Sequence, residues 1–233
     1  MIIMLWCRGE QVLPNSIRPN TCKMGEYCSP LPVKWANTIR PYLFMNQNSM
    51  SALILSGGQS CRMGKEKRLI NYHGKTQEQY LFDLLSNCFS AVYVSINQNQ
   101  TTDLPYIQDL DFGVKSPMVG IVSAFNYNPN VAWLVVACDM PFVDEKAIEF
   151  LVKHRNSQKF ATAFENLEEH FPEPLLTIYE PKIFPILQEA INQGKKSPMK
   201  VLQNLDIESL QEFDNLWIRN INTVEERSGI NGF

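Results

Sequence analysis

The segment from Ser51 to Ile70 constrains the fold of this chain more than any other. It opens with an apolar run, Ala52–Ser56, that is typical of a buried parallel strand. The run ends at Gly57-Gly58, and four basic side chains follow within the next ten residues: Arg62, Lys65, Lys67 and Arg68. Glycines let backbone N–H groups approach a ligand, and basic side chains neutralise anionic charge. The segment therefore predicts a site for a nucleotide polyphosphate.

Composition limits the classes of protein to which the chain can belong. Its 233 residues are 45% hydrophobic and carry a formal net charge of -3, so a sizeable core in one domain is expected and nucleic acid is not favoured as a partner. No stretch approaches the roughly 20 apolar residues of a membrane span. The apolar N-terminal residues lack the basic region of a signal peptide. We expect a cytoplasmic protein without a membrane partner.

Residues 1–49 differ in pattern from the rest of the chain. Five prolines interrupt them, and neither a helical period nor strand alternation is sustained. We expect an irregular, weakly ordered N-terminal extension here. A regular domain is then expected over residues 51–227, with a C-terminal tail at residues 228–233.

Apolar runs and helical patterns alternate along residues 51–227. Strands are expected at Ala52–Ser56, Ala91–Ile96, Tyr106–Ile107, Val131–Ala137, Phe160–Phe164, Leu175–Tyr179 and Leu216–Ile218. Helices are expected at Gln77–Phe89, Met118–Tyr127, Asp144–His154, Pro181–Asn192 and Pro198–Leu205. This alternation predicts an α/β fold, Rossmann-like, with a mostly parallel sheet and helices on both faces. Such sheets bind ligands beyond the carboxyl ends of their strands.

Small or polar residues follow four of the expected strands: Gly57-Gly58, Asn97, Asp109 and Asp139. A carboxylate such as Asp139 at a strand end can hold Mg²⁺ that is shared with phosphates. The alternative, a helix cap ahead of Pro141, is less favoured beside a basic glycine loop. We predict that Arg62, Lys67 and Asp139 stabilise the charge that develops as a bond to pyrophosphate breaks.

The loop lacks the pattern of a P-loop or of a dinucleotide-binding fingerprint. Instead, Leu55-Ser-Gly-Gly-x-Ser-x-Arg-Met-Gly-x-x-Lys67 resembles the signature loop of the MobA-like NTP transferases, the family of the molybdenum cofactor guanylyltransferases. Further matches follow in order over residues 51–227: a strand ending in Asp109, Pro117-x-x-Gly120, Cys138-Asp-Met-Pro141, Pro172-Glu-Pro-Leu175 and Asn220-x-Asn-Thr-x-Glu-Glu226. The first loop is typical of a broad superfamily, whereas the ordered set indicates the guanylyltransferase branch.

The resemblance implies a nucleotide-diphospho-sugar transferase-like fold and an enzyme that transfers GMP from GTP to molybdopterin, releasing pyrophosphate. It implies Asp139 as the Mg²⁺ ligand and Arg62 and Lys67 as phosphate cations, with Lys65 as the substitute for Lys67. The residues assigned to the nucleotide are Leu55, Ser56, Gly57, Gly58, Lys67, Ser95, Asn97, Asp109 and Asp139. The residues assigned to the acceptor substrate are Glu173, Pro174, Asn220 and Asn222, with His170 as a further candidate.

Other functions remain open on the sequence alone. A cytidylyltransferase of the same pathway or a sugar-phosphate nucleotidylyltransferase would use the same loop with another base or acceptor. A nucleotide-binding accessory module is the non-enzymatic alternative, although pure binding does not require a metal carboxylate together with phosphate cations. The expected partners are GTP and the molybdopterin cofactor, besides proteins that deliver the cofactor or receive it as molybdoenzymes.

Overall fold

The structure of the 233-residue chain is a computed structural model, which describes residues 50–56, 66–166 and 170–220. Several predicted residues and segments lie outside the described residues: Gly57, Gly58, Arg62, Lys65, Asn222, the extension 1–49 and the tail 228–233. Their roles, and the domain boundaries, stay predictions.

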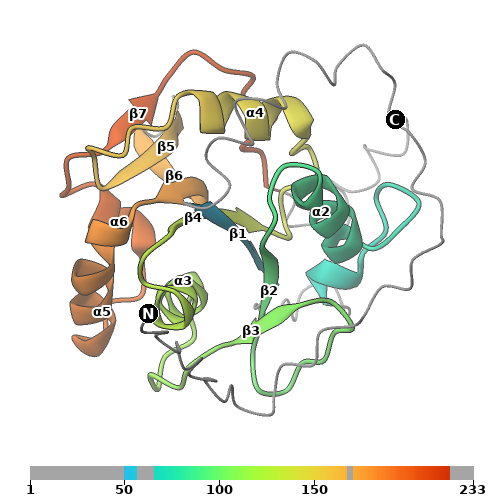
Figure 1. The fold of residues 1–233 in the computed structure, drawn as a ribbon, viewed down its shortest axis with the longest axis horizontal. Helices are drawn as coiled ribbons and strands as arrows, with labels where there is room; N and C mark the ends of the chain where they lie inside the picture. The colour runs from blue at the N-terminus through green and yellow to red at the C-terminus, as the bar shows by residue number, and fades with distance from the viewer. Residues whose placement is uncertain (1–49, 57–65, 167–169, 221–233) are drawn as a thin grey trace, which may run out of the picture. The chain divides into compact units, whose positions relative to one another are not determined.

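The described residues contain a seven-stranded sheet with the strand order β3-β2-β1-β4-β6-β5-β7 (Figure 1). The strands are β1 (Met50–Leu55), β2 (Val92–Ile96), β3 (Tyr106–Gln108), β4 (Ala132–Ala137), β5 (Ala161–Asn166), β6 (Phe171–Tyr179) and β7 (Glu208–Leu210). β6 runs antiparallel to β4 and β5, whereas the other neighbouring strands of this sheet are parallel. The expected mostly parallel sheet is confirmed.

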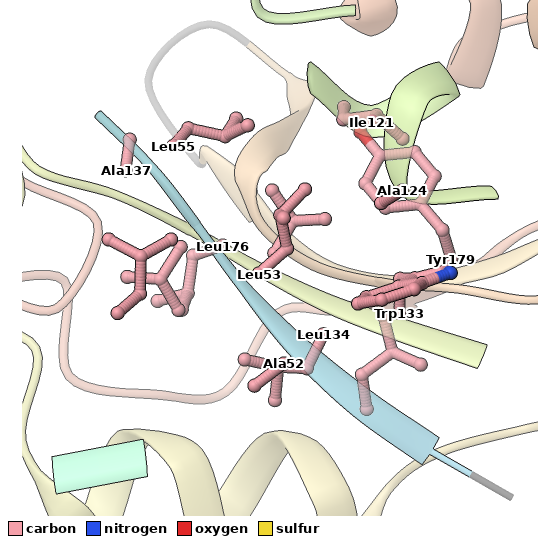
Figure 2. Close-up of a cluster of buried hydrophobic side chains, with 14 of the residues drawn as sticks. Ala52, Leu53, Leu55, Ile121, Ala124, Trp133, Leu134, Ala137, Leu176 and Tyr179 are labelled. Carbon is pink, nitrogen blue, oxygen red and sulfur yellow. The ribbon is translucent and has the colours of Figure 1, made fainter. Parts of the chain in front are cut away.

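The two central strands, β1 and β4, carry the core. Every residue in both strands is buried, as expected for parallel strands that are covered on both faces. Figure 2 shows Leu53 of β1 among apolar side chains from β4, β6 and α3 (Pro117–Tyr127), including Trp133, Tyr179 and Ile121. Burial of this apolar surface holds the carboxyl ends of β1 and β4 in place beside each other.

Helices cover both faces of the sheet. Besides α3, they are α2 (Gln77–Ser86), α4 (Glu145–Lys153), α5 (Phe184–Asn192), α6 (Pro198–Leu202) and the short 3-10 helices η2 (Lys67–Leu69) and η3 (Pro181–Ile183). Figure 1 shows α2 and α4 on one side of the sheet and α3 and α5 on the other. Among the described residues, no helix combines the length and the apolar character that crossing a bilayer requires.

Side-chain caps explain where several helices begin. The Thr76 hydroxyl accepts a hydrogen bond from Gln79 N at the start of α2, and the Asp144 carboxylate accepts one from Ala147 N at the start of α4. At the start of α3, Ser116 is the cap and is followed by a proline at the first helical position. These are the residue types that helix starts favour.

One expected strand was wrong. Leu216–Ile218 forms a turn, and the last strand of the sheet is β7, which pairs in parallel with β5. The ring of Trp217 instead joins an aromatic cluster, with its centroid 6.0 Å from that of Phe164 and 6.5 Å from that of Phe213. The apolar character of the segment therefore reflects packing of aromatic rings and not strand pairing.

Candidate functional site

The candidate site lies where the strand order reverses. From β1 the chain proceeds outward to β2 and β3, and then returns to the other side of β1 for β4. Backbone bonds align the three strand ends: Ser56 N donates to Ser95 O at 3.3 Å, and Cys138 N donates to Leu55 O at 3.2 Å. Open α/β sheets bind their ligands at such a reversal, beyond the carboxyl ends of the strands.

Two predicted catalytic residues, Lys67 and Asp139, come together at this place. Lys67 Nζ donates to Asp139 Oδ2 at 3.1 Å, although 72 positions separate the residues. Their side chains are 23% and 20% exposed, respectively, so both remain accessible to a ligand. Lys67 is the first residue of η2, and Asp139 follows the end of β4 by two positions. The structure thus sets a cation beside a carboxylate at the reversal point.

The second oxygen of Asp139 fits a metal ion. Asp139 Oδ1 is buried and has no hydrogen-bond partner among the described residues, and such an oxygen is costly unless something binds it. Helix capping does not account for Asp139, because Asp144 caps α4. Within the described ranges no group of three or more His, Cys, Asp or Glu side chains is placed so that it could hold a metal ion by itself. One carboxylate, completed by substrate phosphates and water, is a usual arrangement for Mg²⁺.

A chain of short hydrogen bonds connects β1, β2 and Asp109. Ser56 Oγ donates to Ser95 O at 2.6 Å, and Ser95 Oγ donates to Asp109 Oδ1 at 2.6 Å. Burial raises the pKa of Asp109 to about 6, although the hydrogen bond from Ser95 has the smaller, opposite effect of lowering it. Ser95 is only 1% exposed, so the role seen for its hydroxyl is to orient Asp109. Direct nucleotide contacts of Ser56, Ser95 and Asp109 stay predictions.

Gly120 lets α3 approach the ends of β1 and β2. A Cβ at this position would lie 2.7 Å from Leu55 Cδ2 and closer still to Ser95 Oγ. The glycine of the Pro117-x-x-Gly120 motif is therefore a packing requirement beside the residues that orient Asp109. Sequence reasoning noted the motif and missed this reason for it.

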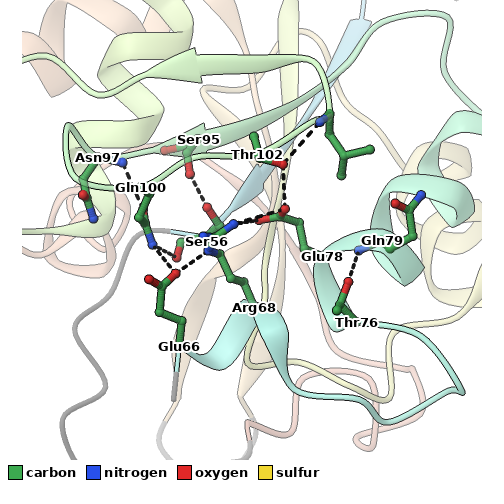
Figure 3. A network of polar contacts seen from close by, with 11 residues as sticks. Ser56, Glu66, Arg68, Thr76, Glu78, Gln79, Ser95, Asn97, Gln100 and Thr102 are labelled. Carbon is green, nitrogen blue, oxygen red and sulfur yellow. Dashed lines mark hydrogen bonds and ion pairs between the residues drawn. The ribbon is translucent and has the colours of Figure 1, made fainter. Parts of the chain in front are cut away.

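Of the described basic residues in the segment Ser51–Ile70, Arg68 is buried. Its side chain is 7% exposed, and Nη1 donates to both carboxylate oxygens of Glu78 at 3.1 and 3.3 Å, while Nε donates to Glu66 (Figure 3). Sequence reasoning counted Arg68 with the cations around the glycine loop and missed its buried partners. A glutamate in the first turn of an expected helix was the only signal for them.

Asn97 follows β2 and shapes the turn there. Its Oδ1 accepts from Asn99 N at 2.9 Å, and its backbone N donates to Gln100 Oε1 at 3.0 Å. The side chain therefore acts as a turn former in the structure. Its predicted nucleotide contact stays a prediction.

The predicted acceptor residues lie on β6 and near the end of the described chain. Glu173 Oε1 accepts from Leu175 N at 2.9 Å, and Pro174 O accepts from the Tyr179 hydroxyl at 2.9 Å. Asn220 Oδ1 is buried without a hydrogen-bond partner in the described ranges. Their contacts with an acceptor substrate stay predictions.

A cavity of about 320 Å³ lies beside β6. Its lining includes His170, Pro172, Leu202, Gln203, Ile207 and Ser209. Of the acceptor-side candidates, His170 lines the cavity, whereas Glu173, Pro174 and Asn220 do not.

Residues 52–210 match the family described as the MobA-like NTP transferase domain. The chain belongs to this family. This match confirms the resemblance that the signature loop indicated. It also confirms that this MobA-like NTP transferase belongs to a nucleotidyltransferase family.

Curated relatives of this MobA-like NTP transferase include two molybdenum cofactor proteins. The molybdenum cofactor biosynthesis bifunctional protein of Synechocystis sp. is 36% identical over 193 residues, which are 80% of this chain and 55% of that protein. The chain thus spans about half the length of that relative. The probable molybdenum cofactor guanylyltransferase of Flavobacterium johnsoniae is 27% identical over 187 residues, 78% of this chain and 97% of that protein.

A solved structure shares the fold of this MobA-like NTP transferase. Molybdopterin-guanine dinucleotide biosynthesis protein A from Archaeoglobus fulgidus superimposes with a TM-score of 0.66 at 24% sequence identity. The match covers 78% of this chain and 96% of that protein. The expected nucleotide-diphospho-sugar transferase-like architecture is confirmed.

Proposed function

We propose that this MobA-like NTP transferase transfers GMP from GTP to the terminal phosphate of molybdopterin or its molybdate form. The products are the guanine dinucleotide form of the cofactor and pyrophosphate. The observation that carries the proposal is the contact of Lys67 Nζ with Asp139 Oδ2 at 3.1 Å, at the reversal point of the sheet. The names of the molybdenum cofactor relatives support the choice of substrates.

The chemistry needs positioned charge and no general base. The acceptor is a phosphate monoester that is already anionic, so its oxygen can form the new bond to the α-phosphorus directly. The bond from the α-phosphorus to the bridging oxygen breaks, and its electron pair leaves with pyrophosphate. Lys67 neutralises charge on the phosphate oxygens as it spreads, and Arg62 is proposed as a second cation.

Asp139 is the residue that we propose to hold Mg²⁺. Its Oδ1 is buried without a described partner, and its Oδ2 accepts the Lys67 ammonium. One carboxylate thereby serves a metal and a phosphate-binding lysine together. When bound, the ion supplies neutralising charge on the triphosphate.

The remaining assignments divide the site between two substrates. Leu55 and Ser56 at the end of β1, the Gly57-Gly58 pair, Ser95, Asn97 and Asp109 are proposed for the GTP side. Glu173, Pro174, Asn220 and Asn222 are proposed for the acceptor side. Residues 51–227 carry this activity in the proposal, and the cytoplasm is its proposed location.

The test measures pyrophosphate release by the full chain with Mg²⁺, molybdopterin and one nucleotide at a time. Release with GTP, and none with CTP or ATP, is the expected result. Release with CTP alone would assign a cytidylyltransferase, and release only when a sugar phosphate replaces molybdopterin would assign a sugar-phosphate nucleotidylyltransferase. GTP binding without release under all these conditions would assign an accessory module.

A further inference from the structure

One side chain of the connection between β2 and β3, that of Gln100, reaches back to the signature segment. Its Nε2 donates to Ser56 O at 3.3 Å and to Glu66 Oε2 at 3.1 Å, and its Oε1 accepts from Asn97 N at 3.0 Å. Figure 3 shows Gln100 between Ser56, Glu66 and Asn97. Because both ends of the amide are bonded, the orientation of the side chain is determined.

The two partners of Nε2 stand on either side of the glycine pair in the chain. Ser56 directly follows β1, and Glu66 directly precedes Lys67. Gln100 lies 44 and 34 positions after them, respectively, so the contact depends on tertiary packing. A single amide therefore bonds to both described ends of the signature loop.

Glu66 is held a second time, by Arg68. The hydrogen bond from Arg68 lowers the pKa of Glu66, against the effect of burial, which raises it, so Glu66 remains an ionised acceptor for Gln100. Arg68 also pairs with Glu78 at 3.1 Å, and the Thr102 hydroxyl donates to Glu78 Oε1 at 2.8 Å.

These side-chain contacts form a continuous network that begins and ends in the β2–β3 connection. They run from Gln100 through Glu66, Arg68 and Glu78 to Thr102, which belongs to the same β2–β3 connection as Gln100. Arg68 and Glu78 are buried, with side chains 7% exposed, whereas the Glu66 side chain is 43% exposed. The buried, paired part of this network makes it rigid.

We infer that Gln100 is a positioning residue for GTP binding, which holds Ser56, at the end of β1, and Glu66 in place beside the nucleotide. This inference rests on the proposed function. Among the described residues, the Gln100 side chain hydrogen-bonds to neither Lys67 nor Asp139, so its effect falls on GTP binding and not on the chemical step. Side chains and backbone that are held in place before the ligand binds lose less conformational entropy on binding.

The test compares Gln100→Met with Gln98→Met in the full chain. Methionine is an unbranched side chain of similar length and forms none of the three hydrogen bonds of Gln100. Gln98 is exposed in the same turn, so it receives the same substitution as a matched control. The dissociation constant for GTP is measured by calorimetry, and KM and kcat are measured from pyrophosphate release.

Gln100→Met loses all three hydrogen bonds and is expected to raise both KM and the dissociation constant for GTP about 10-fold, an effect of the size of one net hydrogen bond. Its kcat at saturating GTP is expected to stay within about two-fold of wild type, and Gln98→Met is expected to match wild type throughout. A purely structural role would reduce the amount of active enzyme, lowering apparent kcat and leaving KM unchanged. That pattern, or equal KM values for the two variants, would overturn the inference.

A second variant, Gln100→Glu, keeps the acceptor for Asn97 N and sets a carboxylate against Glu66. It is expected to weaken GTP binding at least as much as Gln100→Met, and a wild-type dissociation constant would contradict the inference. If wild type binds GTP but releases no pyrophosphate, the proposed function is wrong while the binding comparison still decides the role of Gln100. Absence of GTP binding by wild type would overturn both.

Discussion

Lys67 Nζ and Asp139 Oδ2 lie 3.1 Å apart at the point where the sheet reverses its strand order. The contact joins Lys67, the first residue of η2, to Asp139, which lies two positions after the end of β4. A cation and a carboxylate in one place can act on a nucleoside triphosphate and its metal together.

Asp139→Asn is expected to lower kcat by roughly 100-fold or more, because the amide cannot supply the negative charge that the metal and Lys67 require. The ion pair is partly exposed, so its loss should cost about 1 kcal/mol or less in stability. Pyrophosphate release gives kcat, and thermal unfolding gives Tm. Near-normal turnover in this variant would remove Asp139 from the proposed metal site.

Stability should depend on pH through Asp109. Burial holds the pKa of this carboxyl at about 6 in the folded protein, above the value of about 4 in an unfolded chain. The raised pKa contributes stability that is present below pH 4 and lost as pH rises through 6. The unfolding free energy of wild type relative to Asp109→Asn should thus fall by up to about 3 kcal/mol between pH 4 and pH 7.

Urea unfolding at several pH values measures this difference, and Asp103→Asn, at an exposed position of the preceding loop, controls for the loss of one carboxylate. A difference between wild type and Asp109→Asn that is independent of pH would contradict the burial of an ionisable Asp109.

Gly120→Ala should destabilise the fold by about 1–3 kcal/mol, because the new methyl group overlaps Leu55 and Ser95. Displacing Ser95 also breaks its 2.6 Å hydrogen bond to Asp109. Denaturant unfolding measures the loss. Ser95→Ala removes one of the overlapping atoms, so Gly120→Ala should cost less stability in the Ser95→Ala background than in wild type. An equal cost in both backgrounds would show that another contact limits the helix.

Glu78→Gln and Asp83→Asn make a matched pair on α2. Glu78 binds Arg68 with both side chains 7% exposed, whereas Asp83 binds Lys75 with side chains 45% and 40% exposed. Breaking the buried pair should cost about 3 kcal/mol, and breaking the exposed pair less than about 1 kcal/mol. Denaturant unfolding compares them, and equal losses would mean that Arg68 is not held by Glu78.

Much of the fold is predictable from local patterns in the sequence. The apolar run Val131–Ala137 and the residues that follow it place Asp139 at a strand end, and β4 (Ala132–Ala137) agrees with that reading. Asp144 and Pro117 mark helix starts through their side chains and backbone geometry. These signals depend on residues a few positions apart, so no tertiary information is needed to read them.

Local patterns fail where distant packing decides the structure. Leu216–Ile218 has the apolar character of a strand, but Trp217 packs on the rings of Phe164 and Phe213 and the segment forms a turn. Arg68 has the character of a phosphate-binding cation in sequence, but it is buried against Glu78. In both cases a partner elsewhere in the fold determines the outcome.

The sequence by itself determined the alternation of strands and helices, the family resemblance and the identity of Lys67 and Asp139 as candidates. These depend on periodicity and on ordered motifs, which are properties of the chain as written. Only the tertiary structure decided that Lys67 reaches Asp139, that Arg68 is buried against Glu78, and that Gln100 holds Ser56 and Glu66. Those contacts join residues 10 to 72 positions apart, and the packing of sheet and helices brings such residues within hydrogen-bond distance.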